Sequence, residues 1–388
     1  MVSPASAPPA SADIRVISFQ ERVPVPDPRA DSIAPEAQAA LRQFSEDRLI
    51  GYGVDRSDAI QLHQRVLGGQ PWLDAATQLA EGCLQALDAQ PDRASALTRV
   101  SYLRRASALL RMSQVMMLTD TTERSAIYGR AALLYREAAD VAGDRSRVAL
   151  ETPDGTVIGW HVRATAPVVG AAIVIGGIEG YAMDFDCVGE ALAQRGVETL
   201  LLDAPGQGET RFTHGNYLTA TWRQAFDAAI DHLETAAPGQ PIALIGNSMG
   251  GSVAMAVAAS DSRVRACVDN GGIPAPWMVP PSIGTFFTKM VAYCGVEDPD
   301  DAIDVWTTVT PLVPGANADY DLLVIHGGAD PMVSEDMAKT VFAKAPAGER
   351  EMVVFSDGVH CIYNHKTDRD ALIADWVRDR LGAEAAGR

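Results

Sequence analysis

Six short apolar runs between residues 171 and 355 restrict most strongly how this chain can fold. Each run is three to five residues long, and segments with helical spacing separate one run from the next. The runs are Ala171–Ile175, Thr199–Leu202, Ile242–Ile245, Ala266–Val268, Leu322–Ile325 and Met352–Phe355. Continuous apolar strands that alternate with helices are typical of a parallel sheet covered by helices on both faces. We therefore predict an α/β fold with a mostly parallel, doubly wound sheet.

A different spacing of apolar residues precedes these runs. From Tyr102 to Met117, and again from Ile127 to Val141, small or apolar residues recur at steps of three and four. This spacing is typical of amphipathic helices, and we expect the two helices to pack as a hairpin. After Arg147 the pattern changes to two short strands around an Asp-Gly turn, which predicts a β-hairpin.

These patterns divide the chain into three parts. Residues 1–30 are rich in Pro, Ala and Ser and predict a flexible arm. Residues 31–145 predict an all-helical N-terminal domain, and residues 146–388 predict the α/β domain. Within the latter, residues at about 273–318 carry several Pro and aromatic side chains between two predicted strands. We expect this stretch to be an insertion that lies over the active site.

The segment Gly246-Asn-Ser-Met-Gly250 follows a predicted strand directly and precedes an Ala-rich helical segment. A serine flanked by glycines between a strand and a helix is typical of a nucleophile elbow, a sharp turn that exposes the hydroxyl. Glycine is favoured on both sides because the backbone is crowded there. The sequence therefore predicts Ser248 as a nucleophile, and the alternative is a purely structural turn.

A serine hydroxyl is a poor nucleophile without a general base, and two later strand ends supply candidates. Asp330 and then His360 each lie just past a predicted strand, in the chain order that this kind of site uses. We predict that His360 accepts the serine proton and that Asp330 orients the imidazole. Asp269, after the preceding strand, is the alternative acid, and His365 is the competing base.

The loop after the strand at 171–175 reads Gly176-Gly-Ile-Glu-Gly-Tyr181. We predict that the backbone amides of Ile178 and Met249 form an oxyanion hole, with the Glu179 amide as the alternate to that of Ile178. The same loop places the Glu179 carboxylate near Ser248. That carboxylate either holds a polar substrate or shares a proton in the cleft, or it stabilises the start of the next helix through the helix dipole.

The composition of the chain excludes several classes of partner and cofactor. The formal net charge of −18 repels nucleic acid and anionic membranes, so we expect neither as a partner. Five scattered cysteines without a CxxC pair indicate reduced thiols, and the chain lacks a P-loop, a dinucleotide fingerprint and an HExxH motif. We expect no cofactor and no metal. The N-terminus lacks the apolar region of a signal peptide, and no apolar run is long enough to cross a membrane, so we expect a cytoplasmic protein.

Together these motifs resemble one branch of the α/β-hydrolases. That branch includes 2,6-dihydroxypseudooxynicotine hydrolase, the fermentation-respiration switch protein family and fungal enzymes that shorten polyketide pigment precursors. The likeness covers about residues 35–385: the nucleophile loop, the Gly-Gly-x-Glu loop, an Asp-x-Pro-Gly-x-Gly turn, His-Gly-x-x-Asp, a late Gly-x-His and the preceding helical region. It implies that the N-terminal helices cap the cleft, that Ser248, Asp330 and His360 form a catalytic triad and that Glu179 positions the substrate.

The resemblance also implies a reaction. It implies cleavage of an ester, or of a C–C bond beside a ketone, in a bulky aromatic or polyketide-like metabolite. Tyr181, Trp277 and Phe286 would offer such a small-molecule carbonyl substrate an apolar surface. Alternatives on the same scaffold are an acyltransferase, a cyclase or an acyl-eliminating (lyase-type) enzyme of secondary metabolism, and a non-catalytic binding protein. We also expect a homodimer, since the N-terminal helices could serve dimerisation as well as capping.

Overall fold

The computed structural model describes residues 14–18, 28–90 and 94–385. Within them a nine-stranded sheet runs in the order β1-β9-β8-β7-β6-β4-β5-β3-β2. The first seven strands in that order are parallel, and β3 and β2 are antiparallel at one edge, which confirms the predicted sheet. The strands are β1 Ile14–Ile17, β2 Arg145–Thr152, β3 Gly155–Val162, β4 Gly170–Ile175, β5 Val197–Asp203, β6 Ile242–Asn247, β7 Val264–Asn270, β8 Asp321–Gly327 and β9 Arg350–Phe355.

Strand β1 is the element that the sequence did not predict. Ile14–Ile17 falls within the predicted flexible arm, yet it pairs in parallel with Met352–Phe355 of β9 at the sheet edge. Ile14 and Val16 stay largely exposed, so the segment carries no alternation of buried and exposed residues that would mark a strand. The free edge of β9 supplies the pairing instead. The rest of the predicted arm lies mostly outside the described residues.

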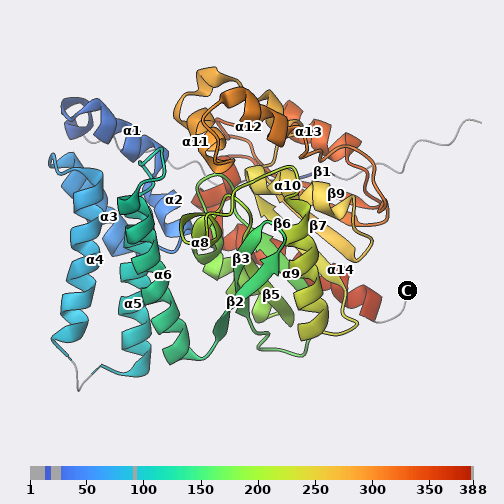
Figure 1. Ribbon diagram of the computed structural model, residues 1–388, viewed down its shortest axis with the longest axis horizontal. Helices are drawn as coiled ribbons and strands as arrows, with labels where there is room; N and C mark the ends of the chain where they lie inside the picture. The colour runs from blue at the N-terminus through green and yellow to red at the C-terminus, as the bar shows by residue number, and fades with distance from the viewer. Residues whose placement is uncertain (1–13, 19–27, 91–93, 386–388) are drawn as a thin grey trace, which may run out of the picture.

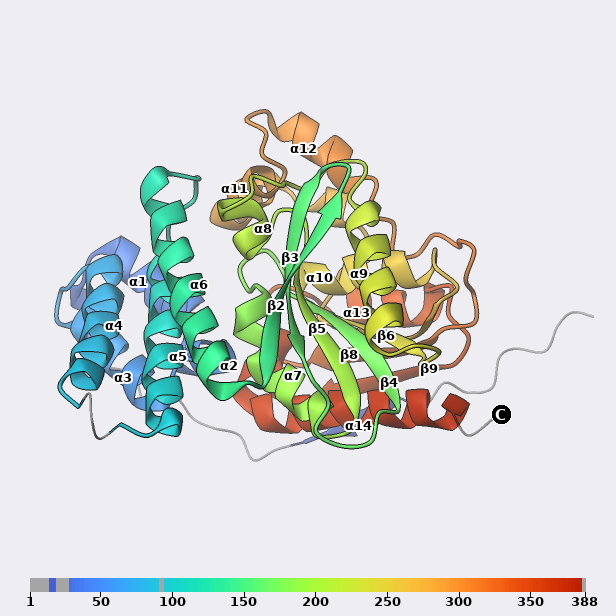
Figure 2. The same cartoon turned by 60° about the horizontal axis from the view of Figure 1, so that its bottom comes forward.

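Helices cover both faces of the sheet. One face carries α7 and α14, and α14 runs along it beneath the strands in Figure 2. The other face carries α9, α10 and α13. The helices are α1 Pro35–Gln43, α2 Glu46–Gly51, α3 Arg56–Leu67, α4 Trp72–Asp88, α5 Ala96–Ser113, α6 Thr122–Ala142, α7 Asp186–Ala193, α8 Gly208–Phe212, α9 Arg223–Ala236, α10 Met249–Ala258, α11 Thr285–Tyr293, α12 Pro299–Trp306, α13 Glu335–Lys344 and α14 Lys366–Ala385.

Helices α1–α6 lie together beside the sheet (Figure 1), and α5 packs against α6 as a hairpin. One continuous apolar core joins these helices to the α7 and α14 face of the sheet. Tyr135 of α6 meets Trp160 of β3 edge-on, with ring centroids 4.6 Å apart. A buried ion pair of 2.7 Å between Arg111 of α5 and Asp184 adds a polar contact. The helical region is therefore held rigidly against the strands.

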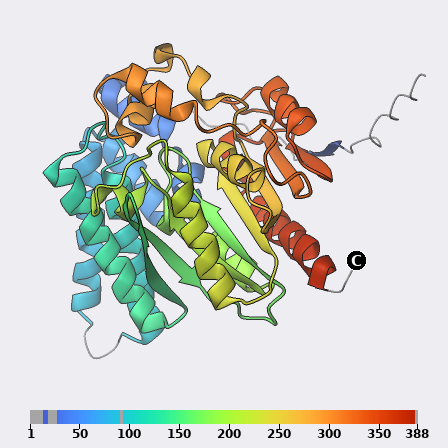
Figure 3. The same cartoon turned by 45° about the vertical axis from the view of Figure 1, so that its right-hand side comes forward.

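The predicted insertion between β7 and β8 contains α11 and α12. In Figure 3 this orange segment lies above the sheet and next to the blue N-terminal helices. Lys289 of α11 donates a hydrogen bond of 2.9 Å to the carbonyl of Val115, just after α5, so the two segments are in contact. The insertion and the N-terminal helices therefore meet at the sheet edge where the parallel strands end. Ligands of α/β folds bind at this edge.

Two further observations bear on the class of protein. None of the five cysteines, all of which are described, forms a disulfide. Across the described residues, the search for a helix long and apolar enough to span a bilayer gave no candidate.

Candidate active site

Ser248 occupies the tight turn between β6 and α10. Its backbone has φ 55° and ψ −131°, a left-handed conformation that a residue with a side chain rarely adopts. Glycines at 246 and 250 permit the turn: a Cβ on Gly246 would lie 2.1 Å from the carbonyl oxygen of Gly250. The Ser248 amide donates to the Asn270 carbonyl at 2.8 Å, which ties the turn to β7. The local geometry is that of a nucleophile elbow.

The structure brings the three predicted triad residues into one hydrogen-bonded chain. His360 Nε2 lies 2.8 Å from Ser248 Oγ, and His360 Nδ1 lies 2.8 Å from Asp330 Oδ2. The other oxygen of Asp330 accepts hydrogen bonds from the amides of Met332 and Val333 at 2.7 and 3.0 Å. These two amides fix the carboxylate, so the imidazole is held with one nitrogen facing the serine.

The electrostatics suit proton transfer from Ser248 to His360. Burial alone would raise the pKa of the Asp330 carboxyl, but its hydrogen bond to His360 and the charge of that ring outweigh burial and lower this pKa. Burial alone would lower the pKa of His360, whereas the interactions with Cys361 and Asp330 raise this pKa above its ordinary value. An ionised Asp330 therefore favours the imidazolium that forms when the serine gives up its proton.

The alternative acid and base lie outside this chain of hydrogen bonds. Asp269 is buried at the end of β7, where its Oδ1 accepts from the Gly272 amide at 2.7 Å, and burial raises its pKa to about 7. His365 Nε2 lies 2.9 Å from Asp357 Oδ1 instead of facing the serine. His360 is thus the base that contacts Ser248, and Asp330 is the acid that contacts His360.

The loop after β4 packs directly on the nucleophile. A Cβ on Gly177 would lie 2.8 Å from Ser248 Cβ, so only glycine fits at this approach. Gln207, in the turn after β5, donates to the carbonyls of Gly176 and Gly177 at 2.7 and 3.0 Å. Gln207 therefore fixes the orientation of the peptides beside Ser248. From the sequence, this turn is identified only as the Asp-x-Pro-Gly-x-Gly motif, with no role given to Gln207.

We expect Gly177→Ala to lower kcat/KM by about 100-fold, because the added methyl group must displace the reacting serine or the oxyanion loop by a fraction of an ångström. The assay is hydrolysis of a 4-nitrophenyl ester by the purified variant. Gly129→Ala is the matched control, since a Cβ at that position in α6 meets nothing within 4 Å. Unchanged activity of Gly177→Ala would contradict the assigned position of this loop.

Two cavities meet at Ser248 and His360. The polar lobe, of about 200 Å³, contains Arg48, Tyr52 and Glu179 among its lining residues. The apolar lobe, of about 330 Å³, is lined mainly by carbon-rich side chains from the insertion and from the segment after β8. Both lobes share the residues at their junction: Ser248, Ile283, Phe286, Met332 and His360. Of the predicted oxyanion residues, Ile178 lines the polar lobe and Met249 the apolar lobe.

Only one of the three aromatic residues predicted to bind substrate lines these lobes. Phe286 lies at their junction. Tyr181 is buried instead, with its hydroxyl donating to the Ile178 carbonyl at 3.2 Å and its ring against Tyr128 and Phe212. Trp277 lines a separate, small apolar pocket. Both residues lie close in sequence to predicted site elements. The prediction for them was wrong because each side chain packs into an interface between other segments.

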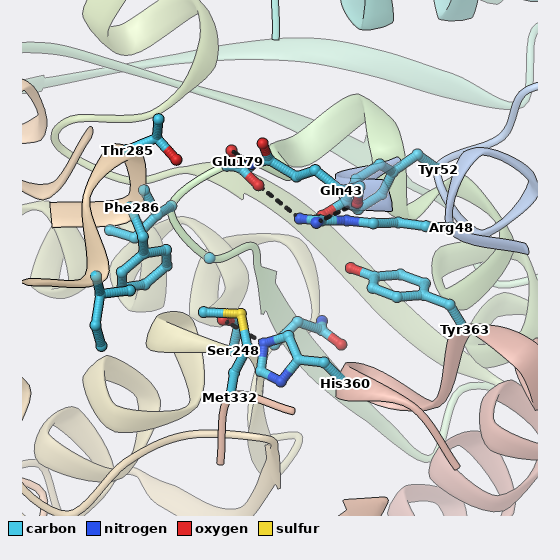
Figure 4. Close-up of a pocket in the computed structure, with 14 residues that line it drawn as sticks. Gln43, Arg48, Tyr52, Glu179, Ser248, Thr285, Phe286, Met332, His360 and Tyr363 are labelled. Atoms are coloured by element: carbon cyan, nitrogen blue, oxygen red, sulfur yellow. Dashed lines mark hydrogen bonds and ion pairs between the residues drawn. The ribbon is translucent and has the colours of Figure 1, made fainter. Parts of the chain in front are cut away.

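Glu179 forms the polar end of the site (Figure 4). Its carboxylate accepts hydrogen bonds from Gln43 and Lys289, and Arg48 Nη2 lies 2.8 Å from its Oε2. Burial would raise the pKa of Glu179, but the charges of Arg48 and Lys289 outweigh burial and lower this pKa. Glu179 is therefore ionised and faces these partners. Its pKa is shifted away from the range in which a carboxyl would share a proton near neutral pH.

Sequence reasoning missed several residues of the polar lobe. They are Gln43, Arg48, Tyr52 and Tyr363, which line it, and Lys289, which pairs with Glu179 behind it. Arg48 and Glu179 are 131 positions apart in the chain, and Lys289 and Glu179 are 110 apart. No local motif marks these side chains, so no signal in the sequence could have found them.

Comparison with known proteins adds to this geometry. Residues 166–293 match the Hydrolase_4 family, described as serine aminopeptidase, S33. The chain is 25% identical over 351 residues to 2,6-dihydropseudooxynicotine hydrolase of Paenarthrobacter nicotinovorans, and the aligned part covers 87% of this chain and 91% of that protein.

Solved structures share the fold. The crystal structure of 2,6-dihydroxy-pseudo-oxynicotine hydrolase matches with a TM-score of 0.74 at 24% identity, over 87% of this chain and 96% of that chain. Wild-type AbyA5 matches with a TM-score of 0.68 at 16% identity, over 89% of this chain and 99% of that chain. The chain therefore has the fold of the α/β-hydrolases, and residues 166–293 within it match a hydrolase family.

Proposed function

We propose that this chain is a serine hydrolase that cleaves an ester, or a C–C bond beside a ketone, in a bulky aromatic or polyketide-like metabolite. The observation that carries the proposal is the hydrogen-bonded chain from Asp330 through His360 to Ser248. Ser248 attacks the carbonyl carbon, and His360 takes the hydroxyl proton and passes it to the leaving group. The amides of Ile178 and Met249 stabilise the oxyanion. Water then attacks the acyl-enzyme and releases the acid.

The two lobes support a substrate whose reacting carbonyl lies between unlike substituents. A carbonyl at Ser248 would place one substituent in the polar lobe and the other in the apolar lobe. Phe286, at the junction, would pack against both parts. The similarity to a hydrolase of a pseudooxynicotine favours cleavage beside a ketone over simple ester hydrolysis.

Helices α1–α6, within residues 31–145, serve in this proposal as a cap over the active site. Support comes from Gln43, Arg48 and Tyr52, which reach from these helices into the polar lobe. A cap of this kind excludes water from the charged end of the cavity and strengthens the interactions made there. Glu179 links the cap to the insertion, since its carboxylate binds Arg48 of the cap and Lys289 of the insertion.

The direct test is covalent labelling with a fluorophosphonate, followed by mass spectrometry of the labelled peptide. Folded protein is expected to carry the label on Ser248, because only an activated serine beside an oxyanion hole reacts rapidly. Heat-denatured protein is the control and is expected to remain unlabelled. A folded protein that resists the reagent would favour a binding protein on a hydrolase scaffold.

We further propose a homodimer formed through the N-terminal helices. Leu97 of α5 and Leu133 of α6 support it, because their side chains are 83% and 65% exposed. Light scattering on a sizing column is expected to give twice the 41.2 kDa of one chain. Leu97→Glu with Leu133→Glu is expected to give monomer, whereas Val168→Glu, at an exposed loop residue, is not. A wild-type mass of one chain would rule the dimer out.

A further inference from the structure

The side chains around the polar lobe carry a positive charge that contrasts with the net charge of −18 for the whole chain. Two cations and one carboxylate lie there, and none of their side chains is more than 18% exposed: Arg48 and Glu179, which line the lobe, and Lys289, which pairs with Glu179. Their formal sum is +1, from two positive groups and one negative group. Buried charges are normally matched by partners of opposite sign, so this excess of positive charge needs a negative partner.

The Glu179 carboxylate is shared by two cations, and a further carboxylate outside the lining of the lobe, Asp120, is shared in the same way. Glu179 pairs with Arg48 and with Lys289. Asp120 pairs with Arg211 at 2.8 Å and with Arg124 at 3.3 Å. Burial, together with the neighbouring cations, lowers the pKa of both Lys289 and Arg124. The positive charge is thus incompletely compensated by the protein's own groups.

Arg48 presents part of this charge to the cavity. Its Nη1 donates to the Gln43 carbonyl at 2.9 Å and its Nη2 to the Tyr52 hydroxyl at 3.1 Å, while its buried Nε–H has no protein partner. Figure 4 shows the guanidinium of Arg48 on the side of the cavity opposite Ser248 and His360. A ligand that reaches Ser248 therefore extends toward the positively charged guanidinium of Arg48, which lines the same cavity.

Asn247 adds a second unused donor beside the nucleophile. Its side chain is fully buried, and its Oδ1 accepts from Asn270 Nδ2 at 2.7 Å. The Asn270 amide also donates to the Cys361 carbonyl at 3.3 Å, which fixes the orientation of both amides. Asn247 Nδ2 is then left without a partner, in a residue that lines the polar lobe.

Resting on the proposed function, we infer that the polar lobe recognises a substrate group with one negative charge on oxygen, a carboxylate or an enolate or phenolate. Arg48 binds this oxyanion while the reacting carbonyl lies at Ser248. Because Arg48 and Lys289 share the single Glu179 carboxylate, the charge of Arg48 is only partly neutralised and can also attract the ligand. The apolar lobe accepts the uncharged remainder of the substrate.

The test uses calorimetric titration of full-length Ser248→Ala protein, so that binding is measured without turnover. Two pairs of probes match in shape and differ in charge: benzoate with benzamide, and the enolate of 1,3-cyclohexanedione with its neutral O-methyl enol ether. At least one anion is expected to bind about tenfold more tightly than its neutral partner, the size expected of one charged hydrogen bond. A preference for benzoate identifies a carboxylate as the recognised group, and a preference for the enolate identifies an enolate or phenolate. Equal binding within both pairs would overturn the inference.

Variants then assign the preference to Arg48. Added to the same background, Arg48→Met is expected to abolish the preference for the anion and Arg48→Lys to retain part of it. Glu179→Gln, which removes a negative charge, is expected to tighten anion binding. Arg99→Met, at an exposed pair with Glu137, is the control and leaves the preference unchanged. If Arg48→Met and Arg48→Lys both keep the full preference, Arg48 is not the site and the inference fails.

The result is separable from the proposed function. Fluorophosphonate labelling of wild-type Ser248 reports the nucleophile and does not depend on the charge of the ligand. Labelling without an anion preference would refute the inference alone, whereas an anion preference without labelling would refute the hydrolase mechanism alone.

Discussion

Ser248→Ala is expected to lower kcat by about 10⁴-fold or more while the protein stays folded. The variant removes the atom that attacks the carbonyl and leaves His360 and Asp330 without a proton donor to act upon. Alanine can take the same backbone conformation as serine at this turn, and the two lobes of the cavity are unchanged. Affinity for substrate should therefore persist while turnover is lost.

The measurement is steady-state hydrolysis of 4-nitrophenyl esters, together with mass spectrometry of aryl ketones and esters incubated with each protein. Ser252→Ala is the matched control, because this buried serine lies on α10, just after the turn, and its hydroxyl exchanges hydrogen bonds with the carbonyl and amide of Ile273, at 2.8 and 2.9 Å. Its activity should change little. Full turnover by Ser248→Ala would contradict covalent catalysis and would favour a lyase-type elimination in which His360 acts as the base.

Asp330→Asn is expected to lower kcat by about 10³- to 10⁴-fold, whereas Asp269→Asn is expected to lower it less than about tenfold. An amide at 330 can donate to His360 Nδ1, which would stabilise the tautomer that cannot accept the serine proton. The Asp330 carboxylate lies 2.8 Å from that nitrogen, and Asp269 faces the Gly272 amide instead. The two substitutions are alike chemically, so the comparison isolates the contact with His360.

Activity of both variants is measured against pH, with circular dichroism as a check on folding. The variant lacks the ionised partner that stabilises the imidazolium. The kcat of Asp330→Asn should therefore stay low at alkaline pH as well as at neutral pH. A larger loss in Asp269→Asn than in Asp330→Asn would transfer the role of acid to Asp269.

The hydrogen-bonded arrangement of Ser248, His360 and Asp330 was predictable because its signals are local. Ser248, Asp330 and His360 each follow a strand whose apolar run is visible in the sequence, and parallel strands bring their carboxyl ends to one edge. The same reasoning failed for Tyr181 and Trp277. Both lie within a few residues of predicted site elements, but burial against other segments turns their side chains away from the lobes.

The sequence by itself determined the parallel sheet, the nucleophile elbow and the order of its partners, because strand periodicity and turn chemistry depend on neighbouring residues. The tertiary structure alone decided that Arg48 and Lys289 meet at Glu179, that β1 joins the sheet edge, and that the cavity has one charged and one apolar lobe. Those features join residues far apart in the chain, and their contacts arise only when separate segments pack against one another.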